Sequence, residues 1–200
     1  MLGALDAVLA DINYREITST VNLGDHFYGP LDPQQTFERL NGLNLPSICG
    51  NCDRLLVDGS NAFEGSTLLS NRRQLKPKHL RWISALRPVL LWNKVLLCHG
   101  TPIHDDVCLL ETVNSTGVRA ASPSEARARL GKFKTRTSLV LCGHSHVPRT
   151  FSLPRGPLIL GSVVNFAVFV RNGRQSGICL QNICSSRSIF TNVASALQGF

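Results

Sequence analysis

Residues 139–146 read Leu-Val-Leu-Cys-Gly-His-Ser-His, four apolar residues that lead directly into a glycine and two histidines. A short continuous apolar run that ends at a turn residue is typical of a buried strand. Side chains that follow such a strand lie at the edge where α/β sheets bind ligands. Because imidazole is the commonest metal ligand in proteins, this stretch predicts a buried strand that ends in a metal-binding loop.

Three other stretches repeat this arrangement. Apolar runs at 20–23, 46–49 and 95–98 are followed by Gly-Asp, by Gly-Asn-Cys-Asp and by His-Gly. If the strands share one sheet edge, their loops bring together one carboxylate, one amide oxygen and three imidazoles. The predicted metal ligands are Asp25, Asn51, His99, His144 and His146.

The segments between these runs favour helices. Leucines at 2, 5 and 9 have helical spacing, and Asp32-Pro33 is typical of a helix start. A third helix is predicted between Leu75 and Leu86, and a capping box at 122–125 predicts a fourth. The runs at 89–92 and 94–98 predict two strands joined by a turn at Asn93, and the sequence after His146 contains short β-like pieces. The expected fold class is therefore α/β.

The four motifs, in this order, resemble those of the calcineurin-like metallophosphoesterase superfamily, most closely its small bacterial, phosphodiesterase-like members. The similarity continues around the motifs, through 22–25, 29–31, 51–54, 96–102 and 140–149. It implies a mixed β-sandwich flanked by helices, a four-layer αββα architecture, in one domain covering residues 1–200. The resemblance fades after about residue 163.

The chain departs from this family at its beginning. Family members open with a strand that ends in an Asp-x-His pair, and a helix follows that strand. Here the spacing of the first leucines places Leu2 already inside the helix. We therefore expect the first strand and the first metal-binding motif to be missing.

The resemblance implies a role for each predicted ligand. Asp25 would bridge two divalent transition metal ions (Mn, Fe, Zn or Ni), Asn51, His99 and His144 would complete one site, and His146 would bind the other ion. Asn51 and His99 are also the expected catalytic residues, and Asp53 would act by holding a ligand in orientation. Since only Asp25 and His146 remain for the second ion, we expect one tightly bound metal.

The resemblance implies metal-dependent hydrolysis of small phosphoesters by metal-activated water, as a phosphodiesterase or phosphatase. Cys52 stands where many relatives have a histidine, and a thiol is a poor acid for alkoxide leaving groups. This favours a phosphodiesterase-type subgroup. The alternative is a catalytically impaired or inactive fragment that binds a single metal.

Composition limits the other classes of function. No apolar run approaches the roughly 20 residues that span a bilayer, and no signal peptide opens the chain, so we expect a cytoplasmic protein without a membrane partner.

Residues 1–125 contain 11 basic and 13 acidic residues, whereas residues 126–200 contain 10 basic and no acidic residues. Such a basic region could bind nucleic acid. Because the arginines of this region are scattered along the sequence, the favoured explanation for its lack of acidic residues is a truncated or frame-shifted reading of a longer gene.

The cysteines and remaining histidines leave further alternatives. Cys49 and Cys52 have redox-pair spacing, and together with Cys98 and Cys142 they could form a structural zinc module. Buried free thiols are the favoured interpretation. Among the other histidines, His26 is not expected to bind a metal, His79 is expected on a helix face, and His104 could touch substrate.

Overall fold

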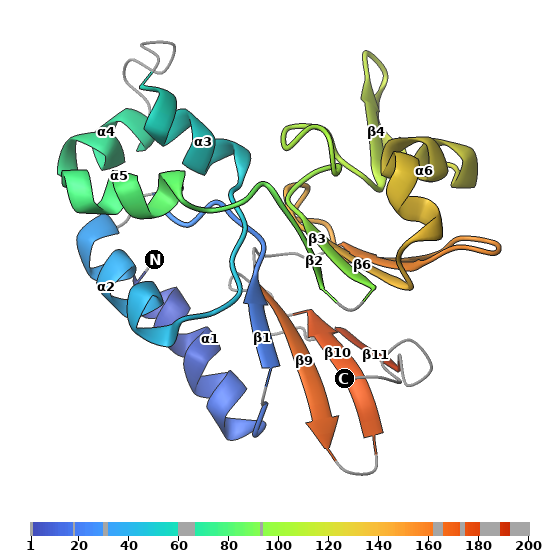
Figure 1. Cartoon of the computed structure of the whole chain (residues 1–200), viewed down its shortest axis with the longest axis horizontal. Helices are drawn as coiled ribbons and strands as arrows, with labels where there is room; N and C mark the ends of the chain where they lie inside the picture. The colour runs from blue at the N-terminus through green and yellow to red at the C-terminus, as the bar shows by residue number, and fades with distance from the viewer. Residues whose placement is uncertain are drawn as a thin grey trace.

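The computed structural model describes residues 2–17, 19–29, 32–59, 67–92, 94–161, 166–172, 175–180 and 189–192. This part of the chain contains a five-stranded, a four-stranded and a two-stranded sheet, together with the helices that pack on them (Figure 1). The helices are α1 (Leu2–Tyr14), α2 (Pro33–Leu43), α3 (Asn51–Asp58), α4 (Thr67–Gln74), α5 (Pro77–Ser84) and α6 (Pro123–Leu130), which a 3-10 turn, η2 (Gly131–Thr135), follows. The strands are β1 (Ser19–Asn22), β2 (Val89–Trp92), β3 (Val95–Cys98), β4 (Glu111–Asn114), β5 (Gly117–Ala120), β6 (Leu139–Cys142), β7 (Arg149–Ser152), β8 (Leu158–Gly161), β9 (Phe166–Asn172), β10 (Gln175–Leu180) and β11 (Ile189–Asn192).

The five-stranded sheet has the order β2-β3-β6-β8-β7. Its three central strands, β3, β6 and β8, are parallel, and both edge strands pair antiparallel. Parallel strands buried on both faces consist of continuous apolar residues, as β3 and β6 do. Alternate residues face opposite layers: Leu97 and Leu141 belong to one apolar core, and Leu96 and Val140 belong to another. The predicted strands at 95–98 and 139–142 are thus confirmed.

The second sheet is antiparallel, with the order β1-β9-β10-β11. Val21 and Leu23 pack into the core on one face of the five-stranded sheet, together with Ile48. The opposite face of that sheet is covered by Ala126 and Leu130 of α6 and its neighbourhood. The predicted α/β fold class, with a mixed sheet flanked by helices, is confirmed.

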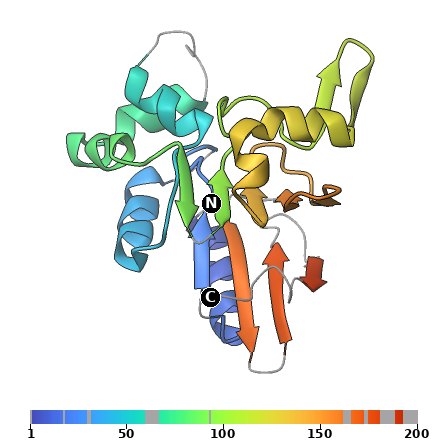
Figure 2. The ribbon, with the colours of Figure 1, turned by 45° about the vertical axis from the view of Figure 1, so that its right-hand side comes forward.

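The helices α2 to α5 form a separate layer with its own apolar core, built around Phe27, Phe37, Leu56 and Ile83. Figure 2 shows these helices on one side of the sheets and α6 on the other. The predicted start of α2 is confirmed, since the Asp32 carboxylate accepts a hydrogen bond from the backbone of Gln35. The capping box of α6 at Ser122 is present too.

Several sequence-based boundaries are wrong. Residues 46–49 form no strand, only two isolated bridges: Ser47 pairs with Asn22 on one side, and Ile48 pairs with Arg87 on the other. The helices α3 and α4 and the β4–β5 hairpin were not predicted. The helix expected from Leu75 begins at Pro77, where proline suits the first helical position.

Other predictions fall partly outside the described residues. The turn at Asn93 lies outside them, as does part of the region after His146 in which short β-like pieces are expected. Strands β7 to β11 lie in the described part of that region. No helix in the described ranges combines the length and the apolar character needed to cross a membrane. The division into one domain remains a prediction.

Candidate metal centre

Asp25 lies in a tight turn directly after β1. The Asn22 side chain accepts a hydrogen bond from the Gly24 backbone (2.9 Å), and the chain then turns through left-handed conformations at Gly24 (φ 98°) and Asp25 (φ 57°). A positive φ is uncommon for a residue other than glycine. The Asp25 carboxylate is almost fully buried, and its Oδ1 accepts a hydrogen bond from the Cys52 backbone at 2.9 Å.

The loop that contains Asn51 approaches the Asp25 loop because two glycines lack side chains. A Cβ atom on Gly24 would lie 2.5 Å from the backbone nitrogen of Gly50. A Cβ atom on Gly50 would lie 2.3 Å from Oδ1 of Asp25. Both distances are far inside van der Waals contact, so these loops touch only with glycine at both positions.

Four of the five predicted ligands meet at this point. The His99 Nε2 atom lies 3.2 Å from Oδ2 of Asp25 and 3.0 Å from Oδ1 of Asn51. The same Asn51 oxygen lies 3.1 Å from Nδ1 of His144. These side chains come from four separate segments of the chain, and each histidine lies within two residues of the end of a central strand, β3 or β6.

The acceptor atoms around Nε2 of His99 can be bridged by a proton or by a metal ion. The His99 Nδ1 atom donates its hydrogen to the backbone oxygen of Leu23 at 2.6 Å. In a neutral ring the Nε2 atom then presents a lone pair to the carboxylate of Asp25 and the amide oxygen of Asn51, which are themselves acceptors. Either a proton or a metal ion between them removes this repulsion. Ligands of a transition metal about 2.1 Å from the ion lie about 3.0–3.4 Å from one another, which fits these separations.

The donor set nevertheless depends on Asn51. Among the described residues, no group of three or more His, Cys, Asp and Glu side chains is disposed to hold a metal ion. A cation at this point would therefore need the amide oxygen of Asn51 in addition to the carboxylate and the imidazoles. Such a mixed nitrogen and oxygen set suits a divalent transition metal.

His146 does not join this group by any hydrogen bond or ion pair within the described residues. Its side chain is exposed, and both His144 (φ 67°) and His146 (φ 54°) have left-handed backbones. Residues 144–146 are therefore not an extended segment, in which alternate side chains would point the same way.

The electrostatics of the three central groups reflect their contact. Burial alone would raise the pKa of Asp25, but the hydrogen bond and charge of His99 outweigh it and lower that pKa. Burial likewise opposes a charged His99, yet Asp25 raises its pKa. Burial and then the charge of His99 lower the pKa of His144. Proximity to Asp25 thus favours a proton or a metal ion at the His99 ring. The lowered pKa of His144 favours its neutral ring, which has a lone pair that can bind a metal.

Asp53 connects the Asp25 loop to the Asn51 loop through hydrogen bonds. It is completely buried, and its Oδ2 accepts hydrogen bonds from the backbones of Asp25 (2.8 Å) and Gly50 (3.0 Å). The His26 backbone donates to Oδ1 at 2.9 Å, and the His26 ring contacts Oδ2 at 2.7 Å. The sequence interpretation missed His26. Its place directly after Asp25 is a signal that could have included it.

A second missed feature is a bidentate ion pair beside the centre. The Arg54 guanidinium donates to both carboxylate oxygens of Asp105, at 2.7 and 2.8 Å. The pair lines a pocket of about 360 Å³, together with Ile103 and the exposed His104. The suggestion that His104 touches substrate remains a prediction.

The cysteine alternatives find no support. Cys52 belongs to the core of the α2–α5 layer, whereas Cys98 and Cys142 belong to the core beneath α6, so a zinc module of these residues is wrong. Burial and then the charge of Asp53 raise the pKa of Cys49 to about 12. A redox pair needs an accessible thiolate, which this environment disfavours.

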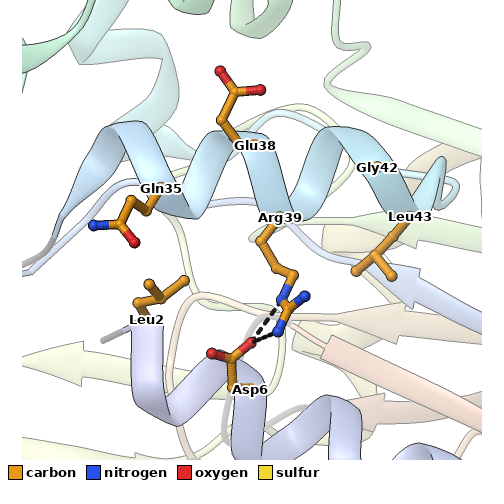
Figure 3. A pocket seen from close by; sticks show the side chains of 7 residues that line it. All are labelled: Leu2, Asp6, Gln35, Glu38, Arg39, Gly42 and Leu43. Atoms are coloured by element: carbon orange, nitrogen blue, oxygen red, sulfur yellow. Dashed lines mark hydrogen bonds and ion pairs between the residues drawn. The ribbon is translucent and has the colours of Figure 1, made fainter.

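Another hollow lies away from the predicted ligands. A space of about 580 Å³ between α1 and α2 is crossed by an ion pair between Asp6 and Arg39 (Figure 3). Its lining contains none of the five predicted ligands. The residues that line it are Leu2, Asp6, Gln35, Glu38, Arg39, Gly42 and Leu43.

Comparison with known proteins supports the architecture. No protein-family model matches the chain. An uncharacterized protein of Methanocaldococcus jannaschii is 29% identical over an alignment of 115 residues, and the match covers 53% of this chain and 47% of that relative. The chain thus matches about half the length of this curated relative.

Solved structures agree over nearly the whole chain. A metallophosphoesterase from Sphaerobacter thermophilus has a TM-score of 0.65 and 22% identity, covering 98% of this chain and 86% of that one. A hypothetical protein from Pyrococcus horikoshii OT3 has a TM-score of 0.60 and 14% identity, covering 95% and 82%. At these identities the likeness concerns the fold. The chain has the calcineurin-like metallophosphoesterase fold.

Proposed function

We propose that this chain hydrolyses phosphoester bonds with a divalent transition metal ion held by Asp25, Asn51, His99 and His144. The observation that carries the proposal is a continuous series of donor atoms: Oδ2 of Asp25, Nε2 of His99, Oδ1 of Asn51 and Nδ1 of His144 lie 3.2, 3.0 and 3.1 Å apart in turn. When bound, such an ion supplies an activated water and neutralises charge on the phosphoryl oxygens.

The protein's own groups have distinct roles in this proposal. Asp25 supplies the negative charge that attracts a cation, and the Leu23 carbonyl fixes the His99 ring so that Nε2 faces the centre. Asp53 holds the backbones of Asp25 and Gly50 in place. Because its Nδ1 hydrogen is donated to Leu23 and its Nε2 would bind the ion, His99 would act on the phosphoryl oxygens only through that ion.

One metal ion per chain is the expected stoichiometry. The four convergent side chains can hold one ion, whereas the described part of the chain would offer a second ion only Asp25 and the exposed His146. Two protein ligands do not hold a transition metal tightly. Manganese is a suitable first ion to test, because the carboxylate of Asp25 and the amide oxygen of Asn51 are ligands that suit it.

The preferred substrates are small phosphodiesters with good leaving groups. Burial and then the charge of Asp25 raise the pKa of Cys52 well above its usual range. Such a thiol is a weak general acid at neutral pH. Aryl leaving groups need no proton, so bis-p-nitrophenyl phosphate is an appropriate probe.

The test compares metal content and turnover of four proteins. The wild type, Asp25→Asn, His144→Gln and the control His104→Gln are purified, metal content is measured by plasma mass spectrometry, and hydrolysis is followed with added manganese. We expect the first two variants to lose metal and activity by at least about tenfold, and His104→Gln to keep its metal. Equal metal content in all four would refute the site. Metal binding without turnover would identify an impaired metallophosphoesterase.

A further inference from the structure

The His26 side chain is buried behind the candidate metal centre and contacts Asp53 rather than any ligand. Its Nδ1 atom lies 2.7 Å from Oδ2 of Asp53, and both side chains are completely buried. A carboxylate can only accept, so Nδ1 carries the hydrogen of this contact. Asp53 thereby receives four hydrogen bonds, three from backbone amides and one from His26.

The opposite side of the His26 ring is held by the helical layer. The ring is perpendicular to Trp82 of α5, at 87° and 5.0 Å between centroids, and Phe27 lies 6.2 Å away. Within the described residues, the buried Nε2 atom has no hydrogen-bond partner. The ring is therefore oriented by one polar contact, to Asp53, and by aromatic packing.

Asp53 holds a backbone conformation that is unfavourable for a residue other than glycine. Asp25 has a φ of 57°, and such strain persists only where the surroundings enforce it. The Asp53 carboxylate binds the amides of Asp25 and His26 with its two oxygens at 2.8 and 2.9 Å. Its orientation therefore decides where the Asp25 side chain points.

We propose that His26 is a positioning residue: by fixing the Asp53 carboxylate between itself and the Asp25 turn, it presets Asp25 for metal binding. This rests on the proposed function, because the ion is the one assigned to Asp25. His26 itself touches neither the ion nor the substrate. Its effect passes through Asp53.

The chain contains a matched control for this proposal. His79 is also buried in the α2–α5 layer, packs on an aromatic ring (Phe37, 4.5 Å) and has an Nε2 atom without a partner among the described residues. Its Nδ1 accepts a local hydrogen bond from the backbone of Lys76 at 3.0 Å. His79→Leu therefore measures the general cost of removing a buried histidine from this core.

The experiment measures manganese affinity by isothermal titration in the wild type, His26→Leu, His26→Asn and His79→Leu. We expect His26→Leu to weaken binding by about 10- to 100-fold. His26→Asn keeps a donor near the position of Nδ1 and should stay within about threefold of the wild type. His79→Leu should bind like the wild type even if its melting temperature falls as much. Equal affinities of His26→Leu and the wild type, or equal losses in both leucine variants, would overturn the proposal.

A second readout does not need the metal. Hydrogen exchange of the Asp25 and His26 amides in the metal-free chain should be faster in His26→Leu than in the wild type, and unchanged in His79→Leu. Unchanged exchange in His26→Leu would overturn the positioning role even if no metal binds. If the wild type binds no manganese while these amides behave as expected, the proposed function fails and the role of His26 in holding the turn stands.

Discussion

Replacing Gly50 with alanine tests how closely the two loops of the centre must approach. Gly50 has φ −94° and ψ 173°, a conformation that alanine adopts freely, so the only penalty is steric. The added Cβ would lie 2.3 Å from Oδ1 and 2.5 Å from the backbone nitrogen of Asp25, and contacts below 3.0 Å essentially do not occur. Asp25 must therefore move away, and its hydrogen bond with Cys52 lengthens.

The expected cost combines these two effects. Overpacking costs about 1–3 kcal/mol, and a weakened buried hydrogen bond adds about 1 kcal/mol or more. We expect Gly50→Ala to lower the free energy of unfolding by about 2–4 kcal/mol, which lowers the melting temperature by about 5–15 °C in a chain of this size.

The same substitution at Gly42 provides the control. Gly42 lies in α2, where a Cβ atom would meet nothing within 4 Å. Alanine is better than glycine in a helix by about 0.5–1 kcal/mol, so Gly42→Ala should stabilise the chain. Thermal unfolding followed by circular dichroism measures both changes. If both variants shift in the same direction, the close approach of the loops is refuted.

Two further predictions concern contacts around the centre. The Arg54 guanidinium lowers the pKa of Asp105, so their ion pair stabilises the fold above the unfolded pKa of about 3.9 and loses its effect as the pH falls below it. In urea unfolding the wild type should exceed Arg54→Gln in stability at pH 7, by an amount that shrinks toward zero in acid; a difference independent of pH would contradict this. Asn71 is buried and its Nδ2 donates to the backbone oxygens of Phe27 (2.5 Å) and Gly29 (2.7 Å). Asn71→Leu should therefore cost about 2–4 kcal/mol in the same measurement, and a loss below about 0.5 kcal/mol would show that these carbonyls need no donor.

The central strands could be predicted from sequence because burial on both faces leaves a continuous apolar run. The strands β3 and β6 have such runs, and each ends at a histidine loop. Residues 46–49 have a similar composition, but their pairing depends on distant neighbours and is limited to Ser47 and Ile48. Local composition cannot reveal how many partners a segment finds.

The start of α3 was missed although its signal is present. Gly50 and Asp53 have the spacing of a capping box, and the Gly50 backbone donates to the Asp53 carboxylate at 3.0 Å. Because these residues were interpreted as a metal-binding loop, the helix that begins there was not predicted. His26 was missed for a different reason, since its partner Asp53 lies 27 positions further along the chain.

Helix capping and the candidate centre share one carboxylate. Asn51 is the first residue of α3, and Asp53, two residues later, caps that helix and also holds the Asp25 backbone. His99 and His144, in contrast, follow strands of the rigid central sheet. The relative position of the two pairs of ligands therefore depends on how α3 begins. Any change that frays the first turn of α3 must displace Asn51 and release Asp25 together, even when the sheet and both histidines stay in place.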